Sequence, residues 1–281
     1  MGGLTALGII MSDTVTTIDR AVESALKRDR VIVLGALSVV VALSWAYVMA
    51  GAGMGMSAFE MVGLGSDNMG TMAPAVWSFS YAGLMFVMWW VMMIAMMLPS
   101  AAPMVLLFAL MNRKQKEKGN PFVPTALFAS AYLVVWAGFS MVAVGAQWGL
   151  ETLSLLSPML ESANVVLGGG LLLAAGAYQL TPLKQACLSH CRSPLQFILA
   201  HWRNGLGGAF RMGVEHGSFC VGCCWFLMGL LFFGGVMNLY WIAGIAVFVM
   251  LEKTIPAGHW ISRMVGVALI VWGIALLVTI T

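Results

Sequence analysis

Long apolar runs separated by short polar segments are the dominant pattern along the chain. Seven runs approach or exceed the length of about 20 residues with which an α-helix crosses a bilayer. They cover residues 31–51, 84–111, 124–148, 163–182, 213–236, 239–257 and 262–281. A segment in lipid must satisfy its own backbone hydrogen bonds, so each run is predicted to be an α-helix. The pattern predicts an all-α fold, one polytopic transmembrane bundle of about seven spans over residues 31–281.

Basic residues fall in alternate connections between these runs, which predicts an orientation. Under the positive-inside rule the N-terminus and all these connections are cytoplasmic. A membrane is the expected location, and the net charge of +3 then reflects topology and gives no reason to expect nucleic acid. The basic residues are Arg20, Lys27, Arg28, Arg30, Arg113, Lys114, Lys116, Lys118, Lys184, Arg192, Arg203, Arg211, Lys253 and Arg263.

The first 30 residues form a tail before the bundle. Val15, Ile18, Val22 and Leu26 recur at helical spacing, which predicts an amphipathic helix over 14–28 on the inner membrane surface. A frayed polar tail is the alternative. Translation from either Met1 or Met11 is compatible with this pattern.

Two spans carry unusual residues. The run 84–111 would be about 42 Å long as a straight helix, and it contains Pro99 and Pro103. A kinked or partly unwound segment that faces protein or a cavity is expected there. Glycines and alanines crowd the run 163–182 and predict close helix packing.

Composition narrows the function. Hydrophobic residues make up 61% of the chain and charged residues 9%, so a soluble domain of useful size does not fit between the spans. P-loop and His-Glu-x-x-His motifs are absent, and conventional soluble-enzyme chemistry is therefore not expected.

All five cysteines and three of the four histidines lie between residues 187 and 224. Cys187 and Cys191 are four residues apart, and so are His216 and Cys220, with Cys224 one turn further on. This spacing puts each pair on one helix face. Thiolates and imidazoles are ligands of soft transition metals, although a single free cysteine is more often a small buried hydrophobe.

Methionine adds to this chemistry, since the chain has 23 of them. Met85, Met88, Met92 and Met96 recur at helical spacing, a stripe that suits packing as well as ligation. Thioethers favour copper(I) over zinc or iron. The proposed metal ligands are Cys187, His190, Cys191, His216, Cys220, Cys223, Cys224, Met92, Met96 and Met228.

Three charged residues are expected close to this site. Glu215 directly precedes His216, and Glu252 and Lys253 end the sixth run. Charged groups near membrane depth are costly unless they are paired or functional. Either Glu252 orients a ligating histidine, or it pairs with Lys253 at the interface.

Three stretches resemble a bacterial family of unknown function that is described as predicted metal-binding integral membrane proteins. The resemblance covers about residues 84–256. It rests on the run 92–104, on 178–184 with Cys187, Cys191 and 192–194, and on His216, Cys220 and 222–225 with 235–238, Glu252 and Lys253. It implies a metal-binding role and no particular reaction.

These observations lead to three hypotheses. The first is a membrane protein that binds copper(I), with zinc or iron as alternatives, and transports it or delivers it to a membrane cuproenzyme. The second is a structural or assembly subunit of a larger membrane complex, in which cysteine and methionine serve packing. The third is a thiol-redox membrane protein using Cys220 and Cys223. The lipid bilayer is a partner in all three.

Overall fold

A computed structural model gives the fold for residues 30–53, 76–117, 119, 123–157 and 160–279. Within these ranges the regular secondary structure is helical, apart from an isolated bridge between Leu156 and Ser162. The predicted all-α class is therefore confirmed. The predicted helix over 14–28 lies outside the described residues.

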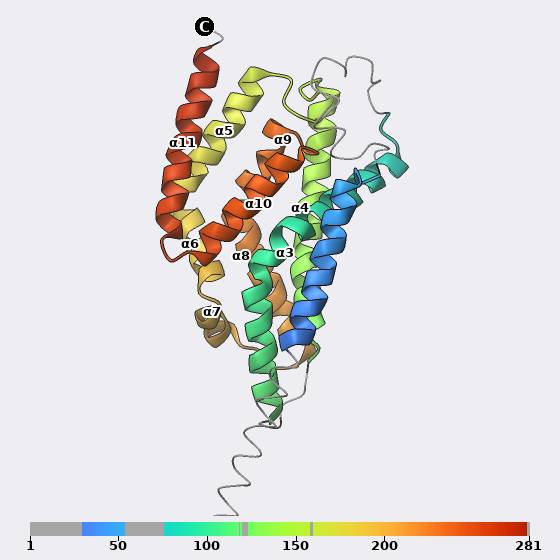
Figure 1. Ribbon diagram of the computed structural model, residues 1–281, viewed down its shortest axis with the longest axis vertical. Coiled ribbons are helices and arrows are strands. Elements are labelled where there is room, and N and C mark those ends of the chain that lie inside the picture. Colours follow the sequence, from blue (N-terminus) through green and yellow to red (C-terminus); the bar gives the residue numbers. More distant parts are fainter. Residues whose placement is uncertain (1–29, 54–75, 118, 120–122, 158–159, 280–281) are drawn as a thin grey trace, which may run out of the picture.

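The helices follow the apolar runs closely (Figure 1). The first described helix, blue in Figure 1, is Arg30–Met49. Those after it are α3 (Phe79–Glu117), α4 (Thr125–Thr152), α5 (Val165–Leu180), α6 (Pro182–Arg192), α7 (Pro194–His201), α8 (Gly205–Gly229), α9 (Leu231–Gly234), α10 (Leu239–Thr254) and α11 (Gly258–Val278).

The described residues contain five helices long and apolar enough to cross a membrane, or six if α5 and α6 count as one broken span. These two helices meet at a bend of 66°. Pro182 lacks the N–H that would continue α5, and the Thr181 hydroxyl accepts from the Lys184 N–H to start α6. The sixth predicted span, α10, is not among these candidates, because it has 16 residues, about 24 Å of helix. The count of seven thus remains a prediction.

Helix α3 runs without interruption through both prolines, over 39 residues. The predicted unwinding is absent from this described helix, but the ribbon changes direction near its middle in Figure 1. The Met97 carbonyl there accepts a hydrogen bond from Ser100 Oγ at 2.8 Å, and Tyr132 OH lies 3.3 Å from the same oxygen. Side chains thus bind the backbone of α3 close to Pro99, on the side that faces α4.

Glycines allow the other helices to approach α8. A Cβ on Gly213 or Gly217 would collide with α4, and a Cβ on Gly222 would lie 2.9 Å from Cys187 Sγ of α6. Because glycine carries no side chain at these points, α4 and α6 pack directly on the α8 backbone. This contact brings the cysteines of α6 to those of α8.

Helices α5 and α11 pack side by side (Figure 1). A Cβ on Gly176 would lie 2.7 Å from the Gly266 carbonyl oxygen and 3.0 Å from the Ile270 nitrogen. Gly170, one turn and a half earlier, has nothing within 4 Å of its Cβ position. The predicted close packing is thus present, at particular glycines only.

Replacement of these two glycines should have opposite effects. We expect Gly176→Ala to lower the free energy of unfolding by about 1–3 kcal/mol, because the backbone of α11 cannot move aside locally. Gly170→Ala should be neutral or slightly stabilising, since alanine favours helix at an open position. Thermal unfolding of both variants in the same detergent measures the difference, and equal midpoints would contradict this packing.

Candidate metal centre

The thiol of Cys220 lies where four helices meet. Its Sγ is 3.0 Å from Lys253 Nζ of α10 and 3.1 Å from Tyr132 OH of α4. Lys253 Nζ also donates to Ser100 Oγ of α3 at 3.2 Å. The exposed fractions of Cys220, Lys253 and Tyr132 are 1%, 7% and 0%. A single sulfur atom in the core therefore has an ammonium group and a phenol as direct neighbours.

Lys253 gives this thiol a particular role. A buried ammonium has three donors and no acceptor, and its burial is costly unless an opposite charge lies beside it. Of the two side-chain atoms that accept from Lys253 Nζ, only Cys220 Sγ can carry a negative charge. Cys220 is therefore the thiolate partner of Lys253.

Three further cysteines lie close to Cys220. Cys191 Sγ of α6 is 4.0 Å from Cys223 Sγ of α8. The thiols of Cys223 and Cys224 donate to the Cys220 carbonyl at 3.1 and 2.9 Å, and Cys224 Sγ is 3.9 Å from Met97 Sδ. All are buried and free of disulfides. We call Cys191, Cys220, Cys223 and Cys224 the thiol cluster.

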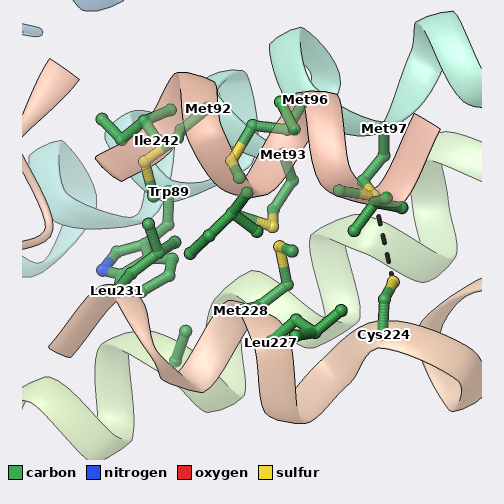
Figure 2. Close-up of a cluster of buried hydrophobic side chains, with 14 of the residues drawn as sticks. Trp89, Met92, Met93, Met96, Met97, Cys224, Leu227, Met228, Leu231 and Ile242 are labelled. Carbon is green, nitrogen blue, oxygen red and sulfur yellow. Dashed lines mark hydrogen bonds between the residues drawn. The ribbon is translucent and has the colours of Figure 1, made fainter. Parts of the chain in front are cut away.

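Buried methionines continue from this cluster. Met92 and Met96 of α3 and Met228 of α8 are each about 1% exposed or less. Figure 2 shows Met93 and Met228 pointing toward one another, and the dashed contact from Cys224 at the end of the same group. The predicted thioether residues thus belong to one core together with the thiols.

The imidazole of His216 is buried among aromatic rings. Its ring centroid is 5.7 Å from that of Tyr132, 6.2 Å from Phe128 and 5.5 Å from Phe197. Its Nδ1 has no hydrogen-bond partner among the described residues. Tyr132 therefore contacts both His216, through its ring, and Cys220, through its hydroxyl.

Cys187 and His190 lie on the outer part of α6. Both are half-buried. The Cys187 thiol packs on Gly222, and the His190 ring stacks on Phe219 with centroids 4.1 Å apart, while its Nδ1 bonds to the Ala186 carbonyl at 2.9 Å. Of the predicted ligands on α6, Cys191 is the one that contacts another thiol.

Glu215 and Glu252 make ion pairs with basic residues rather than contacts to histidine. Glu215 binds Arg211 at 3.1 Å and Arg203 at 3.5 Å, partly exposed. Glu252 Oε1 is 2.6 Å from Lys184 Nζ, and both side chains are fully buried. Neighbouring residues on a helix point about 100° apart, which is why Glu252 faces α6 while Lys253 faces α8.

Sequence reasoning missed several members of the polar core. Tyr132, Ser100 and Gln179 lie on three different helices and are not among the predicted ligands, although Ser100 and Gln179 fall within the stretches 92–104 and 178–184 that carry the resemblance. Lys184, assigned to the cytoplasmic surface, is buried and donates to Gln179 Oε1 as well as pairing with Glu252. The available signal was only that a polar side chain within an apolar run must find a partner.

The donor set suits a soft metal ion, although the described residues contain no group of three or more His, Cys, Asp or Glu already arranged around a metal position. Buried thiols next to thioethers are the ligands that copper(I) prefers. The fold and this cluster thus define a helical protein with a soft-metal donor set at its centre.

Residues 86–276 match the PpoB2 family of copper chaperones, and the chain belongs to that family. The match runs from α3 to α11 and includes the thiol cluster, Lys253 and Tyr132. Searches of curated proteins and of solved structures found no match. Membership in this family agrees with copper binding and delivery. The matched residues 86–276 include most of the stretch 84–256 that carried the resemblance in the sequence.

The two carboxylates should differ sharply when neutralised. Glu252→Gln leaves the Lys184 ammonium buried without its partner, and we expect a loss of about 3–5 kcal/mol in the free energy of unfolding. Glu215→Gln breaks a partly exposed pair and should cost less than about 1 kcal/mol. Denaturant titrations in detergent test this, and equal losses would show that the Lys184–Glu252 pair is not buried as described.

Proposed function

We propose that this protein is an integral membrane copper chaperone that binds copper(I) at the thiol cluster and delivers it to a membrane cuproenzyme. The observation that carries the proposal is the 4.0 Å separation of Cys191 Sγ and Cys223 Sγ, on two different helices. An ion about 2.3 Å from each sulfur, a usual metal–thiolate distance, fits between two sulfurs at this separation.

The number of donors favours copper(I) over zinc. Structural zinc takes four ligands in a tetrahedron, whereas the described residues offer no ready group of three His, Cys, Asp or Glu. Copper(I) accepts soft thiolate and thioether donors. The thiolates of Cys191 and Cys223 are enough to bind copper(I), and Cys220 or Cys224 becomes a third ligand after a side-chain rotation.

Charge balance supports the same assignment. A copper(I) ion with two thiolates has a net charge of −1, which is costly to bury alone. Binding displaces the protons of Cys191 and Cys223, and one of them passes to the Cys220 thiolate, so that the Lys253 ammonium beside it then brings the total to zero. The arrangement therefore holds a monovalent ion between two thiolates without a net buried charge.

The methionines provide a path by which the ion reaches the thiols. Met228 and Cys224 are four residues apart on α8, about 6 Å along the axis, and Cys224 touches Met97. Thioethers bind copper(I) more weakly than thiolates do, so an ion moves from one to the other downhill. Met92 and Met96 extend this path along α3.

The exposed surface of the bundle supports a membrane location. Only 11% of the apolar stretch of Arg30–Met49 and 22% of that of α11 are buried inside the protein. The outward residues include Val39, Leu43 and Trp272, each at least 46% exposed. Apolar surface on this scale is expected to be covered by lipid. The basic residues support a cytoplasmic N-terminus, with Lys184 and Lys253 now set apart because they are buried. The bacterial inner membrane is proposed from the resemblance to a bacterial family.

Loss of the interhelical thiol pair should abolish high-affinity copper binding. We expect the wild-type protein to retain about one copper(I) per chain against a competing chelator, and Cys191→Ser with Cys223→Ser to lose it. Cys187→Ser is the matched control, because its thiol packs on Gly222. Retention of copper by the double variant would contradict the site, and no copper in either protein would favour cysteine as packing in a structural subunit.

Removal of the buried ammonium should weaken the same site without removing a ligand. We expect Lys253→Leu to lower copper(I) affinity about 10–100-fold, the range seen when a supporting group near metal ligands is lost. Lys253→Arg keeps the charge and should recover most of the affinity. Competition with a copper(I) chelator gives both values, and an unchanged affinity in Lys253→Leu would contradict the charge balance.

A further inference from the structure

Two imidazoles meet beside the thiol cluster. His190 near the end of α6 and His201 at the end of α7 have ring centroids 6.3 Å apart, with an angle of 66° between the rings. The chain turns between them at Ser193 and Pro194, which begins α7. The turn brings together two histidines that are eleven residues apart in the sequence, and both are half-buried.

Hydrogen bonds give both rings the same protonation pattern. His190 Nδ1 lies 2.9 Å from the Ala186 carbonyl, and His201 Nδ1 lies 3.0 Å from the Phe197 carbonyl. A carbonyl only accepts, so Nδ1 is the protonated nitrogen of each ring. In a neutral ring Nε2 then keeps its lone pair, which is the form that binds metal.

Aromatic stacking holds these rings in place. His190 lies on Phe219 with centroids 4.1 Å apart and 6° between planes, and His201 lies on Phe197 at 4.7 Å and 17°. Each imidazole is therefore restrained by a backbone bond and by a flat aromatic contact. Such restraint lowers the entropic cost of binding an ion between them.

The spacing of the rings suits one shared ion. A histidine nitrogen binds a metal at about 2 Å, and the centre of an imidazole ring lies roughly 1 Å behind that nitrogen. Two rings that hold one ion from opposite sides thus have centroids about 6 Å apart. The observed separation of 6.3 Å agrees with two-coordinate binding.

The pair also lies where copper would leave the buried cluster. His190 is the neighbour of Cys191 in the chain, and Phe219, on which it stacks, is the neighbour of Cys220. The thiols are buried, whereas His190 and His201 are half-buried. On α8, Phe219 and Cys220 lie at the opposite end of the donor series from Met228.

We propose that His190 and His201 form a second copper(I) site, a two-coordinate pair of imidazoles through which the ion passes between the thiol cluster and the surface. Its role as a transfer site rests on the proposed copper delivery. Neutral imidazoles bind copper(I) without adding negative charge, so this site is weaker than the thiolates and releases the ion more readily. In this proposal His201 is a metal ligand, and His190 acts together with His201 rather than with the thiols.

The test uses the full-length chain with all five cysteines changed to serine, so that thiol binding does not contribute. Titrated anaerobically with copper(I), this protein should bind about one ion per chain, and copper-edge X-ray absorption should show nitrogen ligands near 2 Å. Adding His201→Gln should abolish the nitrogen-ligated copper, whereas His259→Gln, at a histidine that packs on Trp260, should leave it intact. Equal binding in the His201 and His259 variants would overturn the inference.

A second measurement covers the case in which the cysteine-free chain does not fold. In the wild-type protein the first equivalent of copper(I) should have sulfur ligands and the second should add nitrogen ligands, which His201→Gln removes. Sulfur binding alone, with no second ion, would overturn the histidine site and leave the thiol site standing. Nitrogen binding alone would overturn the thiol site and leave the histidine pair standing.

Discussion

The contact between Lys253 and Cys220 is the interaction on which the centre of this protein depends. An ammonium is buried 3.0 Å from a thiol, beside a core of apolar side chains that is rich in methionine. A charge in such surroundings persists only beside an opposite charge. The cysteines around it are thereby more than small apolar residues, since one of them is the partner that the ammonium requires.

The end of α10, at Glu252 and Lys253, also fixes the position of α6 in the bundle. Glu252 binds Lys184 just after the bend between α5 and α6, and Lys253 binds Cys220 of α8. Two adjacent side chains of opposite charge thus fix two helices relative to each other. The result is the approach of Cys191 to Cys223 across the α6–α8 interface. In this account the ion pair positions the ligands, and the lysine balances their charge.

Much of this architecture could be predicted from the sequence, because the cause was local. Apolar runs indicated the helices, and the four-residue steps between cysteines indicated shared faces. The break at Thr181 and Pro182 follows from proline chemistry. The direction that α6 takes after its 66° bend could not be predicted, since contacts with α8 and α10 decide it. That direction places Cys191, rather than Cys187, next to a thiol of α8, and it buries Lys184. The meeting of Tyr132, Ser100 and Lys253 at one sulfur likewise needs three helices to pack first.

The central claim is that the buried thiols bind copper(I), and copper-edge X-ray absorption on purified protein loaded with one equivalent of copper(I) tests it most directly. The account predicts a monovalent ion with two or three sulfur neighbours at about 2.3 Å, a usual metal–thiolate distance. A first coordination sphere made only of nitrogen or oxygen, or no retained copper, would contradict it.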